Sequence, residues 1–566
     1  RNDIVAAYDT IIRNGQVADG TGKRLFAADV ALKGDRIAAV EAPGSLKGDN
    51  EIDATGKVVA PGFIDVHTHD DTALIDNPTM AMKASQGVTT VVCGNCGVSA
   101  APYTRPDVGH WMSLIVKKKE NLSKDFADFA GKVNAAKPAI NGAFLIGHGT
   151  LRINMMGDDL NRVATPGETK QMRELLDQSL SQGAIGMSSG LFYAVSSHAS
   201  TDEVAEVAQP LGRWGGVYTA HMRDEGDHIL KAMDETFEIG RRAGAEIIVS
   251  HHKCSGRTNF GRMKETLPKF TEAMKQQQIA FDVYPYVAGS TILRSDMLDR
   301  ADKVLITWSD KVAGMSGRDL ADIAREMGCS MREAADRIQP AGAIYFMMDE
   351  KDVQAAMSHP GAMIGSDGIP FDAHPHPRLW GTFPRVLGHY SRDLKLFPIE
   401  DAVRRMTSYS ARRFHLVALV VEAVLHLDAD GAAQRVQSEG GIVGPDISAV
   451  DRVGRYQIPV DGVAEGFVEA DAVHVDGDAL WRSLERRGGE TAIAEILRES
   501  VALHVRDGHT GHALHQRVCD RLGVGAGEVV GLQRLRRRRD LVPVDAGVRI
   551  RADGRGRNDI DRRQIG

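Results

Sequence analysis

The sequence predicts an α/β protein whose main domain is a closed (β/α)8 barrel, the TIM-barrel architecture. Two observations carry this prediction. Apolar, strand-like runs recur along the chain with helical stretches between them, which is the pattern of βα units. Candidate metal ligands follow several of these runs, and functional groups in such barrels gather at the carboxyl ends of the strands. We assign the barrel strands to residues 62–67, 88–92, 143–147, 184–188, 216–220, 246–250, 279–283 and 363–366.

The first barrel strand leads into the motif Ala60-Pro-Gly-Phe-Ile-Asp-Val-His-Thr-His69. Side chains alternate between the faces of an extended chain, so His67 and His69 point the same way and can bind one metal ion. A single histidine is more often a surface or core residue than a ligand, and the chain has 20 of them. The paired spacing after a buried strand is what favours a metal site here.

Four later strand-like runs also end in residues that can bind metals. These residues are Cys96, His221, His251 and Asp367. Because the carboxyl ends of barrel strands share one rim, we expect all six side chains to converge at one mouth. Thiolate, imidazole and carboxylate ligands of this kind suit zinc. Cys93-Gly-Asn-Cys96 has no second pair, as a zinc ribbon would need, which favours a ligand role for one of the two cysteines.

The predicted barrel domain spans residues 61–415, and two regions add to its eight βα units. Residues 1–60 read as a small β domain of short strands and glycine turns, with Lys33-Gly-Asp35 as a hairpin turn. Residues 285–362, between the seventh and eighth strands, form an insert that is too long for an ordinary loop and includes a helical pattern at 317–327. Such an insert is well placed to cover a substrate, and a helical pair without that role is the alternative.

The composition sets broader bounds on function and location. A chain of 566 residues exceeds one ordinary domain, and its net charge of -7 argues against a nucleic-acid partner. Five cysteines scattered along such a chain do not make a disulfide framework, which indicates a reducing compartment. No apolar run approaches the length of a membrane span, and no signal peptide precedes the first strand. We expect a cytoplasmic protein with no membrane partner; its oligomeric state is not predicted.

Six longer motifs stand out along the chain. They are Pro61-Gly-Phe-Ile-Asp-Val-His-Thr-His-Asp70, Ser85-Gln-Gly-Val-Thr-Thr-Val-Val-Cys-Gly-Asn-Cys-Gly97, Thr219-Ala-His-Met-Arg-Asp-Glu-Gly226, Ser250-His-His-Lys-Cys-Ser-Gly256, Met363-Ile-Gly-Ser-Asp-Gly368 and His374-Pro-His-Pro-Arg-Leu-Trp-Gly-Thr-Phe-Pro-Arg385. Together they resemble the D-aminoacylase family, the N-acyl-D-amino-acid deacylase branch of the amidohydrolase superfamily. The resemblance extends from about residue 8 to Leu416. It implies zinc-dependent hydrolysis of N-acyl-D-amino acids to a carboxylate and a D-amino acid.

The resemblance also implies how the six ligands divide. Cys96, His221 and His251 would hold a tightly bound Zn2+, while His67, His69 and Asp367 would form a second, weaker divalent site. A thiolate and two imidazoles leave one coordination position open for water, as a catalytic zinc site requires. Asp367 is then predicted to take the proton of that water and deliver it to the leaving nitrogen. Its alternative role is that of a turn-capping aspartate before Gly368.

The substrate is expected to be a small molecule with a free carboxylate, which attracts cations and hydroxyl donors. The candidates for binding it are Lys253, Tyr284, Ser290 and Arg294, of which the first two match family positions and the last is equally well explained as ordinary surface charge. Tyr193 resembles a family position near the scissile carbonyl and could donate a hydrogen bond there.

An apolar side-chain pocket is implied by the resemblance alone. Its matching residues are Phe192, Leu298, Tyr345 and Met348. Aromatic and methionine residues are more often core than pocket, so nothing else in the sequence assigns them. The set favours N-acetyl-D-methionine or N-acetyl-D-leucine over acidic substrates.

The composition changes abruptly at Leu416. Residues 416–566 contain no lysine and no methionine, and family members instead continue with a segment that completes the small β domain. We interpret 416–566 as the product of a reading-frame shift in a GC-rich gene near codons 416–418, since GC-rich codons specify little Lys or Met. The lost partner strands would then expose edges in the N-terminal sheet and lower solubility. A genuine appended domain is the alternative, in which Arg534-Leu-Arg-Arg-Arg-Arg539 is an anion-binding patch or simply a solvated charge run.

Two other function classes remain open at this stage. A cyclic-amide hydrolase, such as a hydantoinase or dihydroorotase, also uses the barrel and the His-x-His pair, but typically bridges two metals with a lysine on the fourth strand. The fourth run, Gly183-Ala-Ile-Gly-Met-Ser-Ser189, has no lysine. An inactive product of a frameshifted gene is the second alternative, which only the aberrant tail favours.

The frameshift interpretation predicts a specific result at the level of the gene. Resequencing across codon 416 should reveal an inserted or deleted nucleotide, after which the corrected frame encodes lysine, methionine and a glycine-rich strand segment. A single open frame in independent reads of both DNA strands would contradict it.

Overall fold

The structure is a computed structural model that describes residues 8–34, 36–109, 112, 114–416, 474–475 and 529–530. Eight parallel strands form its central sheet, in the order β16-β12-β11-β10-β9-β8-β7-β6. A parallel bridge between Thr68 and Gly368 joins the two ends of this sheet, so the predicted barrel is confirmed. The strands are β6 (Phe63–Asp65), β7 (Val88–Cys93), β8 (Asn141–Gly147), β9 (Gly186–Gly190), β10 (Val217–His221), β11 (Glu246–Val249), β12 (Ile279–Val283) and β16 (Ala362–Ile364).

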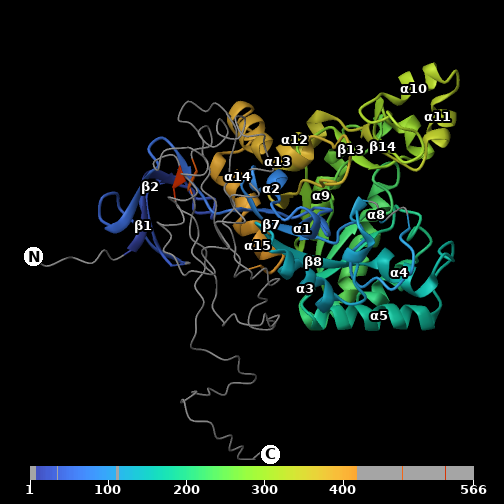
Figure 1. The fold of residues 1–566 in the computed structure, drawn as a ribbon, viewed down its shortest axis with the longest axis horizontal. Helices are drawn as coiled ribbons and strands as arrows, with labels where there is room; N and C mark the ends of the chain where they lie inside the picture. Colours follow the sequence, from blue (N-terminus) through green and yellow to red (C-terminus); the bar gives the residue numbers. More distant parts are fainter. Residues whose placement is uncertain are drawn as a thin grey trace, which may run out of the picture.

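Helices surround the barrel and cover the outer faces of its strands (Figure 1). The best-defined start is that of α5, where Thr165 and Glu168 form a capping box and Pro166 occupies the first turn. The helices are α1 (Ala73–Asp76), α2 (Ala81–Ala84), α3 (Phe126–Ala136), α4 (His148–Met156), α5 (Pro166–Ser181), α6 (Thr201–Val207), α7 (Pro210–Trp214), α8 (Ile229–Ala243), α9 (Met263–Ala273), α12 (Glu350–Ser358), α13 (Arg378–Arg385), α14 (Ile399–Met406) and α15 (Ser408–Arg413). A π-helix, η5 (Val386–Asp393), continues α13. Among the described residues, no helix is both long and apolar enough to cross a membrane.

The barrel interior is a packed apolar core. One cluster of fully buried side chains comes from all eight strands and their ends, including Ile64, Val92, Leu145, Ile248 and Met363. A larger cluster fills the space between the strands and the helices. The interior is therefore closed at its centre, and only the rim at the carboxyl ends of the strands is free to form a site.

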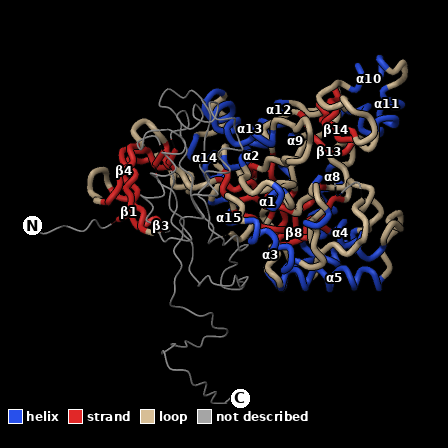
Figure 2. The backbone as a smooth tube through the Cα atoms, in the orientation of Figure 1, coloured by secondary structure: helices blue, strands red, loops and turns tan. Residues whose placement is uncertain are grey.

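The N-terminal residues form a small five-stranded sheet at one side of the barrel, clearly separate in Figure 2. Its strands are β1 (Tyr8–Val17), β2 (Phe26–Lys33), β3 (Arg36–Glu41), β4 (Gly48–Asp53) and β5 (Val58–Val59). β2 and β3 pair as an antiparallel hairpin with Lys33 opposite Arg36, as the sequence predicted. The expectation that a further segment completes this domain, and the frameshift interpretation of the tail, fall on the residues after Leu416. Of that tail the structure describes only β17 (His474–Val475) and β18 (Val529–Val530), which pair with each other.

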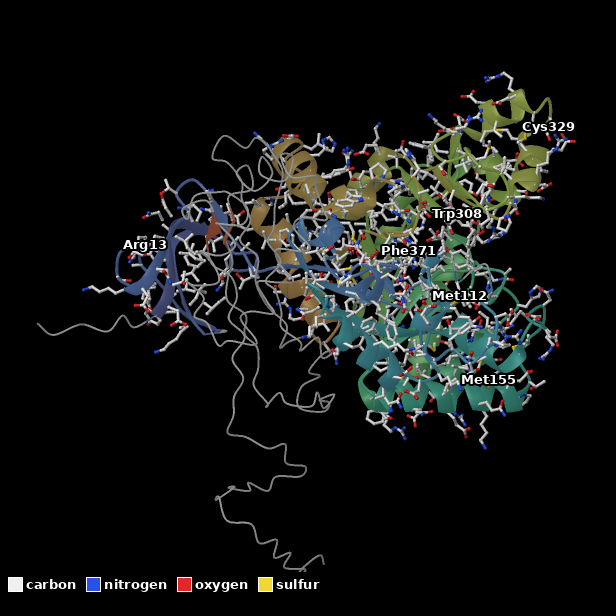
Figure 3. The ribbon with its side chains drawn as sticks, in the orientation of Figure 1. Arg13, Met112, Met155, Trp308, Cys329 and Phe371 are labelled. Atoms are coloured by element: carbon white, nitrogen blue, oxygen red, sulfur yellow. The ribbon has the colours of Figure 1, made fainter. Side chains whose placement is uncertain are left out.

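The insert between β12 and β16 carries a three-stranded antiparallel sheet in the order β13-β15-β14, in addition to the expected helices. Its elements are β13 (Ala288–Ile292), η4 (Ser295–Arg300), β14 (Lys303–Ser309), α10 (Leu320–Glu326), α11 (Met331–Ile338) and β15 (Ala341–Phe346). It rises from the barrel to Cys329 at its far end, and Trp308 lies nearer the barrel (Figure 3). α12, inside the range predicted for the insert, instead packs on α9, β12 and β16 as part of the outer helical ring.

A buried cluster of charged side chains links the first and last strands of the barrel, β6 and β16, at the seam where the barrel closes. The ammonium of Lys83, on α2, donates to Asp65 Oδ2 at 2.8 Å and to Ser366 Oγ at 2.7 Å, and lies 3.3 Å from Asp70 Oδ2. Asp65 Oδ1 also accepts the backbone N–H of Ser366 at 2.7 Å. Lys83, Asp65 and Asp70 have no exposed surface. The cluster thus ties the first strand to the residues that follow the last one, directly beside three predicted ligands.

Replacing Lys83 should show how much the seam contributes to stability. In Lys83→Met, Asp65 and Asp70 stay buried without their cation, and we expect the free energy of unfolding to fall by about 3–5 kcal/mol. Lys170→Ala is the control, because Lys170 pairs with Glu174 at the surface and its loss should cost less than about 0.5 kcal/mol. Urea unfolding followed by circular dichroism measures both. Equal stability of the two variants would contradict the role of the cluster.

Candidate metal centre and substrate pocket

All six predicted ligands meet at the rim of the barrel, and all six are buried. Their donor atoms form two overlapping groups in which every pair lies within 4.8 Å. One group contains Cys96, His221 and His251, and the other contains His67, His69, Cys96 and Asp367. Cys96 belongs to both, with Sγ 3.3 Å from His67 Nε2 and 3.4 Å from His251 Nε2. The thiol of Cys96 is therefore the centre of the cluster.

Three of these ligands adopt a backbone conformation that side chains usually avoid. The φ angles are +54° at Cys96, +35° at His251 and +50° at Asp367. A non-glycine residue in this region costs of order 1–3 kcal/mol and persists only where the surroundings enforce it. Gly190 makes room for this backbone, because a Cβ there would lie 2.1 Å from the carbonyl oxygen of Cys96. Strain concentrated at three converging side chains is typical of a functional site.

The chemistry of the donors fits a metal ion. Tetrahedral zinc, with bonds of about 2.0–2.3 Å, separates a sulfur and a nitrogen ligand by about 3.6 Å, close to the observed separations. Both ring nitrogens of His221 are buried and have no hydrogen-bond partner in the described part of the chain, so one is available for coordination. Burial raises the pKa of the Cys96 thiol, but the imidazoles of His67 and His251 outweigh burial and hold the pKa well below its ordinary value. The thiolate is the form that binds zinc.

Two carboxylates that the sequence analysis did not assign contact ring nitrogens of the candidate histidine ligands. Asp282, at the end of β12, has Oδ2 3.2 Å from His67 Nδ1 and accepts the backbone N–H of His251 on Oδ1 at 3.0 Å. Glu225 has Oε1 3.1 Å from His251 Nδ1, and Oε2 3.5 Å from His221 Nε2. A carboxylate on the second ring nitrogen fixes the orientation and tautomer of a metal-binding histidine. His67 and His251 have such a partner, whereas Nε2 of His221 lies 3.5 Å from Glu225 and makes no hydrogen bond to it.

Asp367 is held between imidazoles and a buried arginine. Its Oδ1 lies 3.1 Å from His69 Nε2 and 3.5 Å from His67 Nε2, while Oδ2 lies 2.8 Å from Nη1 of Arg378. Burial raises the pKa of Asp367, but Arg378 and the nearby imidazoles outweigh burial and keep the pKa well below its usual range. The carboxylate is therefore ionised, which is the form that binds a metal or accepts a proton.

A pocket opens beside the cluster, and three of the candidate ligands, His221, His251 and Asp367, line it. The barrel rim and the insert line it together, so the insert forms part of the pocket wall, and its covering of a substrate stays a prediction. Six of the nine residues predicted for the substrate or the scissile carbonyl line it. They are Phe192, Tyr193, Lys253, Tyr284, Ser290 and Tyr345.

The other three predicted substrate residues lie outside the lining of this pocket. Arg294 is paired with Asp296 at 2.7 Å and its guanidinium covers the ring of Phe192, so it supports the pocket wall. Leu298 is buried in the core of the insert. Met348 lies behind Tyr284, whose hydroxyl is 4.0 Å from the Met348 sulfur.

Several pocket residues were missed by the sequence analysis. The lining also includes Glu225, Met297, Arg300, Met347 and Arg378. Arg378 is fully buried, and its Nη2 donates to the carbonyl of Ser290 at 2.9 Å while its guanidinium stacks on Tyr284. Arg378 lies in the motif His374–Arg385, and Glu225 lies in the motif Thr219–Gly226. The charged residues of these motifs could therefore have been predicted as pocket residues from the sequence. Met297 and Met347 each stand next to a predicted pocket residue.

Comparison with known proteins agrees with this geometry. The sequence pattern of the amidohydrolase family matches residues 50–418. The chain is 48% identical over 479 residues to a D-aminoacylase from Alcaligenes xylosoxydans xylosoxydans, covering 84% of this chain and 95% of that protein. It is 40% identical over 490 residues to an N-acyl-D-aspartate deacylase of the same organism, covering 86% of this chain and 95% of the relative. A match to 84% of 566 residues cannot end at Leu416, so similarity continues farther than the sequence motifs predicted.

Comparison with solved structures also finds similarity to N-acyl-D-amino-acid deacylases. A crystal structure of a D-aminoacylase superposes with a TM-score of 0.73 at 47% sequence identity, covering 76% of this chain and 94% of that one. The N-acyl-D-glutamate deacylase of Bordetella bronchiseptica, solved with zinc and a phosphonate inhibitor, superposes with a TM-score of 0.73 at 40% identity, covering 77% and 95%. Another structural study of D-aminoacylase describes a binuclear metal centre.

The contact of Asp282 with two ligand residues predicts a loss of metal affinity when its charge is removed. In Asp282→Asn, the amide has one acceptor for two partners, and we expect the dissociation constant for zinc to rise about 10–100-fold. Asp352→Asn is the matched control, because Asp352 is also a buried carboxylate but accepts the backbone N–H of Gly261, which is not a candidate ligand. Competition with a chromophoric chelator measures both variants. Zinc affinity equal to that of the control would contradict the supporting role of Asp282.

Proposed function

The chain belongs to the amidohydrolase family, and we propose that it is a zinc-dependent enzyme that hydrolyses N-acyl-D-amino acids to a carboxylate and a D-amino acid. The observation that carries the proposal is the convergence of Cys96, His221 and His251 beside a pocket lined by buried cations. The name of the relative that is 48% identical over most of its length supports the same reaction. Cys96, His221 and His251 form the proposed tight site, and His67, His69 and Asp367 the proposed second site.

The first step of the proposed mechanism depends on Asp367. A bound zinc ion supplies Lewis acidity, which polarises the amide carbonyl and lowers the pKa of water. The ionised carboxylate of Asp367 takes a proton as the oxygen of water forms a bond to the carbonyl carbon. Asp367 then delivers that proton to the amide nitrogen as the carbon–nitrogen bond breaks. Arg378, 2.8 Å from Oδ2, keeps Asp367 ionised between turnovers.

Tyr193 and the cations of the pocket position the substrate in this proposal. The hydroxyl of Tyr193 lies 3.3 Å from Thr291 Oγ1 at the pocket wall and can donate to the carbonyl oxygen as negative charge develops there. The ring of Tyr193 also packs edge-on against His221, with centroids 4.8 Å apart. Lys253, Tyr284 and Ser290 supply a cation and two hydroxyls for the substrate carboxylate, and Arg378 adds a second buried cation.

The proposed side-chain preference is for hydrophobic D-amino acids such as D-methionine and D-leucine. Phe192, Met297, Tyr345 and Met347 give the pocket an apolar wall that can accept a thioether or an isobutyl group. Arg300 is the one pocket cation that is largely exposed, at the end of η4. Its position makes an acidic side chain the natural competing substrate.

Removal of the Asp367 carboxylate should separate catalysis from binding of the tight metal. In Asp367→Asn we expect kcat to fall by about 10²–10⁴-fold, because the amide cannot accept the proton of water. Zinc bound at Cys96, His221 and His251 should remain, since Asp367 is not in that group. Steady-state kinetics and metal analysis of the same preparation test this. Turnover comparable to that of the wild type would reject the proposed role.

A panel of substrates tests the reaction and its selectivity. We expect hydrolysis of N-acetyl-D-methionine and N-acetyl-D-leucine, with kcat/KM at least about tenfold higher than for N-acetyl-D-glutamate, because a carboxylate would be desolvated against the apolar wall. N-acetyl-L-methionine and hydantoin serve as controls for stereochemistry and for the cyclic-amide alternative. Faster hydrolysis of the glutamate substrate would contradict the proposed preference for hydrophobic side chains. Turnover of hydantoin alone would contradict the proposed reaction.

A further inference from the structure

His251 Nδ1 has two partners that compete for it. The ammonium of Lys253 lies 2.8 Å from this nitrogen, and Oε1 of Glu225 lies 3.1 Å from it. The other ring nitrogen, Nε2, faces Cys96 Sγ at 3.4 Å and is the one available to a metal. All three side chains are more than nine-tenths buried, so solvent cannot replace either partner.

The two partners require opposite hydrogen-bonding roles of Nδ1. A ring nitrogen without a proton can accept from Lys253, and a protonated one can donate to Glu225, but it cannot do both. When Nε2 uses its lone pair as a metal ligand, the proton of the neutral ring is on Nδ1. The contact with Glu225 is then a hydrogen bond, and Lys253 loses the ring nitrogen of His251 as an acceptor.

Lys253 has few other anionic or acceptor partners in its surroundings. Its ammonium donates to Glu225 Oε1 at 2.7 Å and to the carbonyl of His251 at 3.1 Å, and it lies 5.9 Å from the ring centre of Tyr284. Lys253 and Glu225 both line the substrate pocket. An ammonium released from Nδ1 therefore has one donor left for an anion in the pocket, and the carboxylate of the substrate fits that chemistry.

We propose that Glu225 is a positioning residue that couples the metal ligand His251 to the carboxylate-binding Lys253, so that metal and substrate bind cooperatively. The proposal rests on the proposed function, which supplies the carboxylate ligand. When metal occupies the tight site, Nδ1 of His251 carries the proton and donates it in a hydrogen bond to Glu225. Lys253 is then free to bind the substrate carboxylate. The coupling is reciprocal. When a carboxylate binds Lys253, Glu225 is free to accept the hydrogen bond of His251 Nδ1, and this bond makes the imidazole a stronger metal ligand.

The test is to measure zinc affinity with and without D-methionine, the product of N-acetyl-D-methionine. Zinc dissociation constants of the wild type, Glu225→Gln and Glu203→Gln are measured by chelator competition, each in the presence of D-methionine or L-methionine. L-methionine binds free zinc as strongly as its enantiomer does, so only a difference between the two reports the site. Glu203 is the matched control, because it is an equally buried glutamate that pairs with Arg152 away from the ligands.

We expect D-methionine to tighten zinc binding by the wild type at least about fivefold relative to L-methionine. Glu225→Gln should weaken zinc binding about 10–100-fold and lose the enantiomer-specific shift, whereas Glu203→Gln should keep both the affinity and the shift. Lys253→Met should lose the shift as well, which keeps the test decisive if Glu225→Gln does not fold.

Two outcomes overturn the proposal, and each is distinguishable from failure of the proposed reaction. If the wild type hydrolyses N-acetyl-D-methionine but D-methionine gives no shift, the coupling is wrong. If Glu225→Gln binds zinc as tightly as the wild type, Glu225 does not position His251. If hydrolysis itself is absent while Glu225→Gln still weakens zinc binding, the reaction proposal fails and the support of His251 by Glu225 stands.

Discussion

Closure of the barrel between its first and last strands is the constraint on which the site depends. Beyond the end of β6, the chain pairs with the segment that follows β16: the backbone N–H of Asp367 donates to the carbonyl of His67 at 2.8 Å, and that of His69 to the carbonyl of Gly368 at 3.2 Å. This pairing brings a carboxylate nearly 300 residues away against two histidines. Gly365 allows the approach, since a Cβ there would lie 2.6 Å from that of His67. Without closure, the proposed second metal site would lose its carboxylate ligand, Asp367.

The energetic cost of the site is distributed over its surroundings. Left-handed backbone at Cys96, His251 and Asp367 is unfavourable, and so is the burial of several charged groups. Carboxylates on the outer ring nitrogens and the hydrogen bond that the backbone N–H of His251 donates to Asp282 offset part of this cost. A bound cation at the centre offsets more, because it would add a positive charge between the thiolate of Cys96 and the carboxylate of Asp367. Loading with metal should therefore stabilise the fold as well as enable the reaction.

The sequence was sufficient for the barrel and for the convergence of the six candidate ligands, because both follow from local rules. Strand-like runs between helical stretches predict βα units, and a ligand at the end of a strand predicts its place at the rim. The residues that escaped prediction act over long separations. Asp282 supports His67 across more than 200 residues, and Lys83 meets Ser366 across the closing seam. The sheet of the insert was missed because its helical pattern at 317–327 dominated a segment whose strands pair only with each other.

The most direct measurement is X-ray absorption at the zinc edge of enzyme loaded with one equivalent of the metal. The account predicts one sulfur scatterer at about 2.3 Å and two imidazole nitrogens at about 2.0–2.1 Å, from Cys96, His221 and His251. The sulfur contribution should disappear in Cys96→Ser. A first shell made only of nitrogen and oxygen in the wild type would contradict a centre built on the thiolate of Cys96.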